Sequence, residues 1–571
     1  MIIQELNAIQ KRYGYLPAEE LRALAMRINV PLHRIHEVAS FYPLYHLKEP
    51  PIVDVKICRD MACHLHGSAN LRGNLEGYGH ELDEKQIRVE GVSCLGQCDH
   101  PVAVSINDCV YWGKTEDQLR SLIRVAYQRE PLPRQQADRS PLGWKIDVYG
   151  GQPNYDAVRK FVADRDADGV IKALEIAGLR GMGGAGFPTF RKWSAVRGAT
   201  SDEKYVVCNA DESEPGTFKD RELLRRTPHL VIEGIIMAGL VTGAKKGWIY
   251  IRHEYHDELE AFEDALQQAQ EMGVCGDHIL GSDLSFPIDI FVSPGGYIQG
   301  EESALLEAME DRRGEPRNKP PYPVFSGLYG KPTVINNVET LAWVPGILKN
   351  GGEWYRDSGT NGATGMRFVS ISGDVNKPGV FEVPFGQTVR ELLELAGGVR
   401  GRQALKAIAP SGPSGGFLPA KIPANQLPKG FIEAKSLPAD RDFDILDLTL
   451  DLPTLASLES MLGAAFVVYG QQRDMVEQAL NCVEFFRNES CGKCVPCRLG
   501  SQKLVDMIGE MLARRFDRSR LNAVEEVSTA MSITSICGLG QVASNPMTSV
   551  LKYFKEDLNR YFSAAVAGHS R

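Results

Sequence analysis

Three cysteines, Cys491, Cys494 and Cys497, stand at two-residue spacing in one loop, and Cys537 follows in Ser-Ile-Cys-Gly-Leu-Gly. Three thiolates on one loop can bind three corners of an iron–sulfur cubane, and a remote fourth thiolate completes the ligand set. A structural zinc ion also accepts four cysteines, but zinc sites usually draw their ligands in two pairs. The spacing therefore predicts a [4Fe–4S] cluster, with structural zinc as the alternative.

Two further pairs of cysteines each follow an expected strand in the first hundred residues. Cys58 ends an alternating segment and Cys63 lies shortly after it, whereas Cys94 and Cys98 follow a second such segment. A [2Fe–2S] cluster needs two thiolates per iron, and two pairs on neighbouring loops supply them. A redox disulfide would explain one pair alone, but the two pairs together favour the cluster.

A glycine-rich segment near the middle of the chain has five glycines within the nine residues that begin at Gly178. Gly181, Gly183 and Gly186 match the pattern G-x-G-x-x-G, but an expected helix precedes them where a dinucleotide fold has a strand. We therefore reject the ordinary Rossmann interpretation. Glycines still let the backbone approach a phosphate, and the start of the following helix is electropositive. With Lys192 just beyond, the segment predicts a phosphate-bearing cofactor.

Acidic residues cluster where two expected strands end. They are Asp211, Glu212, Glu214, Glu301 and Glu302. Carboxylates at strand ends can accept hydrogen bonds from ribose or ribityl hydroxyls, which makes them candidate ligand contacts. A metal site is the alternative, although no histidine accompanies these acids. His253 and His256 follow another strand, lack the zinc-protease spacing and are expected in a solvated loop.

The composition excludes some classes of function. The 571 residues suffice for three or four domains, and the net charge of −9 argues against nucleic acid as the main partner. No apolar run is long enough to span a bilayer, and the first residues do not follow the pattern of a secretory signal. We therefore expect a cytoplasmic protein whose 12 cysteines are ligands and buried thiols rather than disulfides.

Hydrophobic periodicity and turn signals divide the chain into five expected parts. These are short helices and a strand-bearing cysteine domain (1–127), a polar linker (128–145), an α/β domain with ligand loops at strand ends (146–362), a small α+β insert (363–455) and a helical domain (456–571). The insert has no visible chemistry, so we interpret it as a docking module.

In this order, the motifs resemble the NADH-dehydrogenase (diaphorase) module of respiratory complex I and its relatives. The resemblance covers nearly the whole chain and rests on the two cysteine sets and on four motifs: Gly178–Thr189, Asn209–Gly216, Gly300–Glu302 and Asn336–Thr340. It implies an α/β multidomain fold with N-terminal helices, a thioredoxin-like [2Fe–2S] domain, an FMN- and NAD(H)-binding domain, a ubiquitin-like (β-grasp) insert and a C-terminal helical bundle with [4Fe–4S]. Two subunits of the family are fused here.

The resemblance also implies roles for individual residues. FMN would be cradled by Gly181, Gly183, Gly184, Ala185 and Gly186, surrounded by Lys192, Asn209, Asp211, Glu212, Tyr297, Gly300 and Glu301, and contacted on its phosphate side by Asn336, Asn337 and Thr340. NAD(H) would be contacted by Phe187, Glu214, Glu302, Lys319 and Tyr322. The cluster ligands would be Cys58, Cys63, Cys94 and Cys98 for [2Fe–2S], and Cys491, Cys494, Cys497 and Cys537 for [4Fe–4S].

Three positions depart from the family pattern. Ala195 stands where relatives often have an aromatic residue that stacks on adenine, and Met182 replaces an arginine of the glycine loop. Gln299 replaces a cysteine often found before Gly-Glu-Glu. We expect weaker nucleotide affinity from the first and an altered flavin potential from the last.

The implied activity is electron transfer between NAD(H), FMN and the clusters, with no side chain acting as acid or base in the hydride step. A fused arrangement resembles the β subunit of molybdenum- or tungsten-containing, NAD-dependent formate dehydrogenases, whose partner is a larger iron–sulfur catalytic subunit. Diaphorase subunits of NAD-reducing hydrogenases come second, because many of them lack some N-terminal cysteines, and a fused complex I subunit comes third. A zinc-bearing docking scaffold without redox activity is the alternative from another class.

Overall fold

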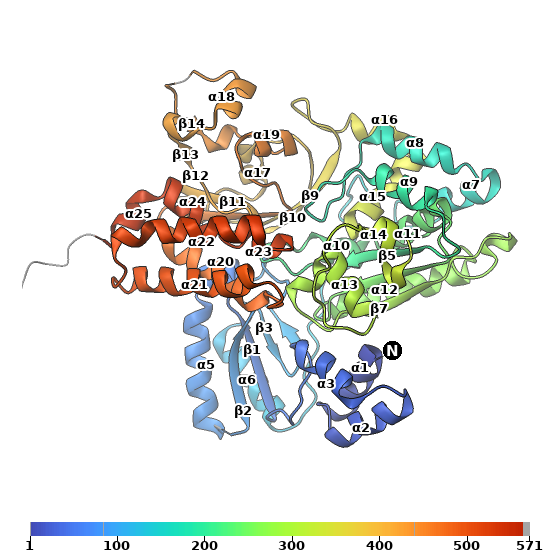
Figure 1. Ribbon diagram of the computed structural model, residues 1–571, viewed down its shortest axis with the longest axis horizontal. Coiled ribbons are helices and arrows are strands. Elements are labelled where there is room, and N and C mark those ends of the chain that lie inside the picture. Colours follow the sequence, from blue (N-terminus) through green and yellow to red (C-terminus); the bar gives the residue numbers. More distant parts are fainter. Residues whose placement is uncertain (1, 84, 439, 563–571) are drawn as a thin grey trace, which may run out of the picture.

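A four-stranded parallel sheet organises the largest unit of the structure, a computed structural model that describes residues 2–83, 85–438 and 440–562 (Figure 1). Its order is β7-β6-β5-β8, with β5 (Tyr205–Ala210), β6 (Lys246–Ile251), β7 (Ile288–Val292) and β8 (Thr333–Asn337). All three pairings are parallel, so the carboxyl ends of the strands meet at one edge. Ligands bind at this edge in open α/β sheets.

Successive side chains of these strands enter two different cores, as the pleat of a strand requires. Val206, Cys208 and Ile249 belong to a core shared with α11 (Pro228–Thr242) and α15 (Val338–Asn350). Val207 and Tyr250 belong to a second core, shared with α1 (Ile2–Tyr13), α2 (Ala18–Arg27), α3 (Leu32–Phe41) and α13 (Glu302–Met309). The N-terminal helices thus pack on the parallel sheet, although the sequence analysis grouped them with the cysteine domain.

Further helices complete this parallel-sheet unit. They are α7 (Asp156–Asp164), α8 (Ala167–Ala177), α9 (Thr189–Gly198), α10 (Lys219–Arg226), α12 (His256–Glu271), α14 (Pro323–Ser326) and α16 (Gly352–Arg356). The helix α11 crosses α15 closely because a Cβ at Gly234 would lie 2.2 Å from the carbonyl oxygen of Leu341. Only glycine fits at that crossing.

The N-terminal cysteine domain contains a second four-stranded sheet, in the order β2-β1-β3-β4. Its strands are β1 (Val53–Cys58), β2 (Ile87–Val92), β3 (Val104–Ile106) and β4 (Cys109–Tyr111), and its helices are α4 (Met61–Leu65), α5 (Ser68–Asp83) and α6 (Glu116–Tyr127). The strands β1 and β2 run parallel, so the loops that follow them lie at the same end. The expected strand-then-cysteine order is therefore confirmed for both pairs.

The insert is built on a five-stranded sheet with the order β10-β9-β15-β11-β12. The strands are β9 (Met366–Gly373), β10 (Gly379–Pro384), β11 (Leu405–Pro413), β12 (Leu418–Pro419) and β15 (Ala465–Gly470), with a small pair β13 (Lys421–Ile422) and β14 (Phe443–Asp444) and the helices α17 (Val389–Leu395), α18 (Lys429–Lys435) and α19 (Leu452–Ser457). The central strand β15 lies beyond residue 455, where the sequence analysis ended the insert. That boundary is wrong because β15 pairs with both β9 and β11.

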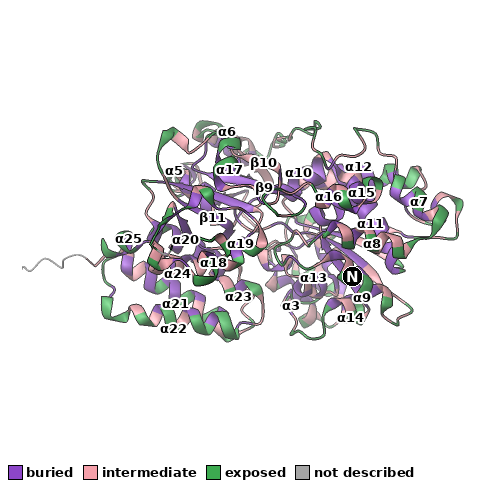
Figure 2. Cartoon of the chain, turned by 90° about the horizontal axis from the view of Figure 1, so that it is seen from above, coloured by how far each residue is buried: buried purple, intermediate pink, exposed green. Residues whose placement is uncertain are grey.

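The C-terminal region is helical, with α20 (Met475–Glu489), α21 (Val495–Leu512), α22 (Leu521–Thr534), α23 (Gly538–Val542), α24 (Asn545–Tyr553) and α25 (Lys555–Asn559). The outer side of α22 carries exposed residues, whereas the central strands β9, β11 and β15 of the insert are largely buried (Figure 2). The helix α20 also contacts the N-terminal cysteine domain, since Asn481 accepts from Met61 N at 2.8 Å. Within the described residues, no helix is long and apolar enough to cross a membrane.

Candidate redox-cofactor site

The N-terminal cysteine group, Cys58, Cys63, Cys94 and Cys98, is gathered in the interior. Cys58 ends β1, Cys63 lies in α4, and the loop after β2 carries the other two. Their exposed fractions are 1%, 1%, 4% and 2% in that order. The sulfurs of Cys94 and Cys98 are 3.4 Å apart, and the Cys58 thiol hydrogen-bonds with Cys63 and Cys94. The two pairs therefore form one group of four.

The surroundings of this group suit metal-bound sulfur. Gly96 N lies 3.4 Å from the sulfur of Cys94, and Gly216 N, from the parallel-sheet unit, lies 3.3 Å from that of Cys98. Hydrogen bonds from the Cys58 and Cys98 thiols lower the pKa of Cys94 well below its usual value. Two sulfurs on one tetrahedral metal ion lie about 3.7 Å apart, so the group fits a [2Fe–2S] cluster. The four thiols form no disulfide.

The C-terminal cysteine group, Cys491, Cys494, Cys497 and Cys537, is assembled from two helix starts. Cys494 and Cys537 are the N-caps of α21 and α23, and Cys497 lies in the first turn of α21. A Cβ at Gly540 would lie 2.9 Å from the Cβ of Cys497, so α23 packs directly on α21. Burial raises the pKa of Cys497 to about 11 and that of Cys537 to about 12. Cluster iron would deprotonate such thiols outright, so this donor set fits [4Fe–4S].

The glycine loop between α8 and α9 has an open tip. Gly183, Gly184 and Ala185 are exposed, and a Cβ at Gly184 (φ +111°) would meet no atom within 4 Å. The base of the loop is fixed, because Met182 N donates to Thr340 Oγ1 at 2.8 Å. Glycines without a neighbour let the backbone approach a phosphate-bearing ligand closely. The loop therefore fits a flavin or nucleotide phosphate.

Charged side chains gather beside this loop. Lys192 Nζ donates to Ile335 O at 2.7 Å and lies 3.8 Å from Glu302. Burial lowers the pKa of this lysine. Lys319 bridges Glu301 and Glu302 at 2.8 and 2.7 Å. Two cations thus balance two acids, and the group can bind both phosphate and hydroxyl groups of a nucleotide.

The acids after β5 lie in the interior, where burial raises their pKa values. The pKa is raised to about 6 for Asp211 and to about 7 for Glu212 and for Glu214. Asn209 Nδ2 donates to Gly300 O at 2.8 Å, which joins this strand end to the turn after β7. Buried carboxyls with few charged partners suit acceptance of hydrogen bonds from ligand hydroxyls.

The end of β8 adds three polar residues to the same edge. Asn336 Oδ1 accepts from the buried indole of Trp193 at 2.9 Å. Asn337 caps α15 by accepting from Glu339 N at 3.0 Å, and it also donates to Asp220. Thr340, in the first turn of α15, is the residue that fixes the glycine loop. The structure thus brings the residues assigned to the phosphate side beside that loop.

Aromatic residues lie at two places around the site. Phe187 and Tyr322 are 49% and 52% exposed, so their rings are open to a ligand from solvent. Tyr297 instead packs on Phe485 of α20, with ring centroids 5.0 Å apart, and its N donates to Glu489 at 2.7 Å. Tyr297 therefore lies between the parallel-sheet unit and the helices that carry the C-terminal cysteine group.

The sequence analysis missed residues that join these groups. Arg252 donates to the carbonyl oxygens of Glu212 and Cys94, at 2.6 and 2.7 Å, and so links the acid loop to the N-terminal cysteine group. Ser414, in the insert, donates to Glu214. The position of Arg252 directly after a strand was an available signal, but only the fold shows what it contacts.

Sequence models of four families match the chain. Their descriptions are thioredoxin-like [2Fe-2S] ferredoxin for residues 1–126, Nuo51 FMN-binding domain for 174–346, SLBB domain for 368–418 and NADH-ubiquinone oxidoreductase-F iron-sulfur binding region for 477–561. Together they span both cysteine groups and the glycine loop.

Curated proteins match over most of their length. An NADH-quinone oxidoreductase subunit of Rhizobium meliloti is 39% identical, over 73% of this chain and 94% of the relative. The NAD-reducing hydrogenase HoxS subunit alpha of Cupriavidus necator is 33% identical, over 97% of this chain and 91% of the relative. A crystal structure of NAD+-reducing [NiFe]-hydrogenase in the H2-reduced state aligns with a TM-score of 0.83 and 31% identity, over 97% of this chain and 93% of that one.

These matches overturn the alternative of a zinc-bearing scaffold, because the matched families bind flavin and iron–sulfur clusters. The cofactors are FMN, a [4Fe–4S] cluster and a [2Fe–2S] cluster, and NAD(H) is the substrate. The chain belongs to the family of NAD(H)-oxidising and NAD-reducing diaphorase subunits that occur in NADH-quinone oxidoreductases and NAD-reducing hydrogenases, with the [2Fe–2S] domain fused to the flavin domain.

Proposed function

We propose that the carboxyl edge of the parallel sheet is the FMN site. The residues proposed to hold FMN are Gly181, Gly183, Gly184, Ala185, Gly186, Lys192, Asn209, Asp211, Glu212, Tyr297, Gly300, Glu301, Asn336, Asn337 and Thr340. The observation that carries this proposal is the convergence of three strand ends on one open glycine loop, with the loop fixed by the hydrogen bond from Met182 to Thr340.

NAD(H) is proposed to bind on the outer side of the same edge. Its contacts would be Phe187, Glu214, Glu302, Lys319 and Tyr322. The two exposed aromatic rings offer stacking surfaces, and Lys319 supplies a cation that Glu301 and Glu302 already orient. The nicotinamide would thus approach the flavin from the solvent side.

FMN, when bound, can exchange two electrons at once with NAD(H) and single electrons with the clusters. The chain contributes orientation and electrostatics. Glu212, fixed by hydrogen bonds from the backbone of Asp220 and Arg221, would present a carboxyl group to the flavin. The eight cysteines of the two groups are the proposed cluster ligands, with the [2Fe–2S] cluster as a branch or storage site.

The partner is proposed to be a larger catalytic subunit that docks beside the C-terminal cysteine group. Val495, Leu499 and Ile533 lie next to these cysteines in the chain and are 55%, 60% and 74% exposed. Exposed apolar residues that gather in one place mark interaction surfaces.

The 12 cysteines, all within the described residues, form no disulfide, which supports the predicted cytoplasmic location.

We propose formate oxidation as the reaction of that partner, so that the chain would be the NAD-reducing β subunit of a molybdenum- or tungsten-containing formate dehydrogenase. The support is that all four cysteines of the N-terminal group are present and buried. In the family resemblance, many diaphorase subunits of NAD-reducing hydrogenases lack some of these cysteines. Hydrogen oxidation is the second candidate, because the relative that matches along 97% of this chain belongs to an NAD-reducing hydrogenase. A fused complex I subunit is the third.

One experiment separates these candidates. The chain is purified anaerobically with the subunits that accompany it, and NAD+ reduction is followed with formate or with hydrogen as the electron donor. Formate-dependent reduction, abolished in Cys537→Ser, is the expected result. Reduction by hydrogen alone would replace the formate proposal with the hydrogenase one. NADH oxidation by an artificial acceptor without either activity would favour the complex I arrangement.

A further inference from the structure

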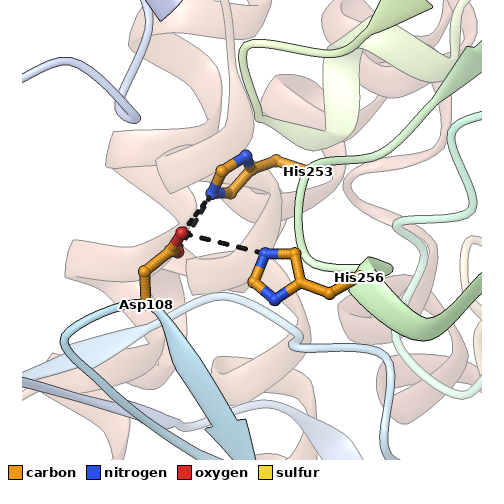
Figure 3. A group of neighbouring side chains, drawn as sticks. All are labelled: Asp108, His253 and His256. Atoms are coloured by element: carbon orange, nitrogen blue, oxygen red, sulfur yellow. Dashed lines mark hydrogen bonds and ion pairs between the residues drawn. The ribbon is translucent and has the colours of Figure 1, made fainter. Parts of the chain in front are cut away.

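Two turns from different domains meet at the surface beside the redox site (Figure 3). Asp108 lies in the tight turn between β3 and β4 of the N-terminal cysteine domain. His253 follows β6 of the parallel-sheet unit, and His256 begins α12. The sequence analysis expected the two histidines in a solvated loop. The structure instead places a carboxylate from 145 residues away in the chain between them.

The three side chains converge on a small volume. His253 Nε2 lies 3.0 and 2.8 Å from the two oxygens of Asp108, and His256 Nε2 lies 3.7 Å from Oδ2. The ligand atoms of all three residues lie within 4.8 Å of one another. Two ligand atoms bound to one tetrahedral Zn2+ lie about 3.4 Å apart. Small rotations of the side chains would bring all three atoms to that separation.

The donor set is that of a borderline transition metal. Two imidazoles and one carboxylate suit Zn2+, which takes nitrogen and oxygen ligands at about 2.0–2.2 Å. The side chains of His253, His256 and Asp108 are 21%, 37% and 57% exposed, so ions can enter and water can complete the coordination. We propose that Asp108, His253 and His256 bind a Zn2+-type ion that joins the N-terminal cysteine domain to the parallel-sheet unit.

The neighbouring charges set the strength of this site. Lys56 of β1 faces Asp108 and His253, and Arg134, in the segment after α6, faces His256. Glu254 adds a negative charge next to both histidines. The two cations oppose an added metal ion and the carboxylate favours it, so we expect binding in the micromolar range rather than the tighter range of buried structural zinc.

A metal ion bound here would stabilise the contact between the N-terminal cysteine group and the acidic loop that follows β5. The loop that carries both histidines also carries Arg252, which links Cys94 to Glu212, and Tyr255, whose hydroxyl donates to Glu212 Oε2 at 3.0 Å. A Cβ at Gly96 would lie 2.6 Å from the Tyr255 ring, so the cysteine loop packs directly on this segment. By holding Asp108 against the two histidines, the ion would also hold the loop that carries Cys94 against the acidic loop that carries Glu212.

The test is a zinc-binding measurement on the holoenzyme, and it needs no turnover. The protein with its clusters is dialysed to equilibrium against a series of micromolar ZnCl2 concentrations, and the bound zinc and iron are assayed per chain. We expect about one zinc in the wild type with iron unchanged. We expect at least about ten-fold weaker zinc binding in His256→Gln and in Asp108→Asn, because each loses a ligand.

The matched control is the double variant His33→Gln/His36→Gln, which removes an exposed histidine pair with the same spacing from α3. It should bind as much zinc as the wild type. A second measurement compares proteolysis of the 128–145 segment with and without ZnCl2, and zinc should slow cleavage only where Asp108, His253 and His256 are intact. No zinc in the wild type, or equal zinc in all four proteins, would overturn the proposal and leave an ordinary ion pair.

Discussion

Each of the two cysteine groups has four thiols, but the groups differ in how far these thiols are buried. Every sulfur of the N-terminal group is buried, and one accepts a hydrogen bond from Gly216 of another domain. In the C-terminal group only Cys497 is buried, at 5% exposure, and the apolar residues Val495, Leu499 and Ile533, nearby in the chain, are exposed. The two groups therefore share the same thiol chemistry, whereas burial separates a site in the interior from one that is partly open to solvent.

Their means of attachment differ as well. The N-terminal group is tied to the parallel-sheet unit by Arg252 and by a buried ion pair in which Arg221 lies 2.7 Å from Asp99. The C-terminal group is tied by its own helices, with Lys493 donating to Pro316 O at 2.7 Å. The first group is thus attached through a buried arginine and a buried ion pair, and the second through helix packing together with the polar contact from Lys493 to the parallel-sheet unit.

The largest expected effect comes from removing one ligand of either group. Cys537→Ser should leave about two of about six irons per chain, and Cys63→Ser should leave about four, because each variant loses one cluster. Iron assays and low-temperature EPR of the reduced proteins measure this. Cys109→Ser, a half-buried cysteine outside both groups, is the control and should keep all the iron. Loss of both clusters in one variant would show that the groups are not independent.

The next effect concerns the buried ion pair between Arg221 and Asp99, which attaches the N-terminal group. Arg221→Met leaves Asp99 buried without its cation, which should cost about 3–5 kcal/mol in the transition that releases the cysteine domain. Arg221 holds the pKa of Asp99 below its usual value. The stabilisation is therefore present above the unfolded pKa of about 3.9 and is lost as pH falls through the lower folded value.

Urea unfolding at pH 7 and pH 3 measures both the cost and its pH dependence. The matched control is Arg27→Met, which breaks the exposed ion pair with Glu5 and should cost less than about 1 kcal/mol. Equal costs for the buried and the exposed arginine would contradict the role of Arg221 in attaching the cysteine domain to the parallel-sheet unit.

A smaller effect is expected from Glu214, whose carboxyl group accepts a hydrogen bond from Ser414 of the insert. Burial raises its pKa to about 7, so the carboxyl is neutral at pH 6 and ionised at pH 8. Because the folded pKa exceeds the unfolded one, this burial costs stability as pH rises from about 4.5 through 7. An ionised carboxylate accepts a ribose hydroxyl better, so the Kd for NADH should fall about ten-fold from pH 6 to pH 8.

Titration of flavin or NADH fluorescence at each pH gives this Kd. Glu214→Gln should abolish the pH dependence, whereas Glu353→Gln, at an exposed glutamate of α16, should leave it intact. A steep pH dependence that survives in Glu214→Gln would assign the titration to another acid.

The smallest effect concerns Gln299, which departs from the family pattern. Its amide is buried at 1% exposure, makes no hydrogen bond within the part of the chain that the structure describes, and lies with Cys491 along one cavity of about 720 Å³. Replacing an unpaired buried amide with an apolar side chain should be stabilising, so Gln299→Leu should raise the apparent unfolding free energy by about 1 kcal/mol. Thermal unfolding measures this, and Gln471→Leu at the surface is the control. Lower stability with loss of FMN would instead place the amide on the cofactor.

Much of this organisation could be predicted from the sequence. The cysteine spacings, the glycine loop and the acids at strand ends are local patterns, so the chemistry of each can be derived from a few neighbouring residues. The position of β15 could not, because a buried strand and a buried helix segment share one apolar pattern and only pairing with β9 and β11 distinguishes them. The N-terminal helices were predicted as helices, but their packing on the parallel sheet is a contact between distant segments that no local pattern indicates.

Thiolate count, glycine spacing and strand-end acids are properties of short segments, so these local patterns indicated the cofactors and led to the residues proposed to bind them. Only the tertiary structure decided which segments meet. It brought Gly216 to the sulfur of Cys98, Arg252 to Cys94, and Asp108 to His253, across separations of more than a hundred residues. The physical reason is that hydrogen bonds and ion pairs act over a few ångströms of space, and the positions that share that space are set by the packing of whole domains.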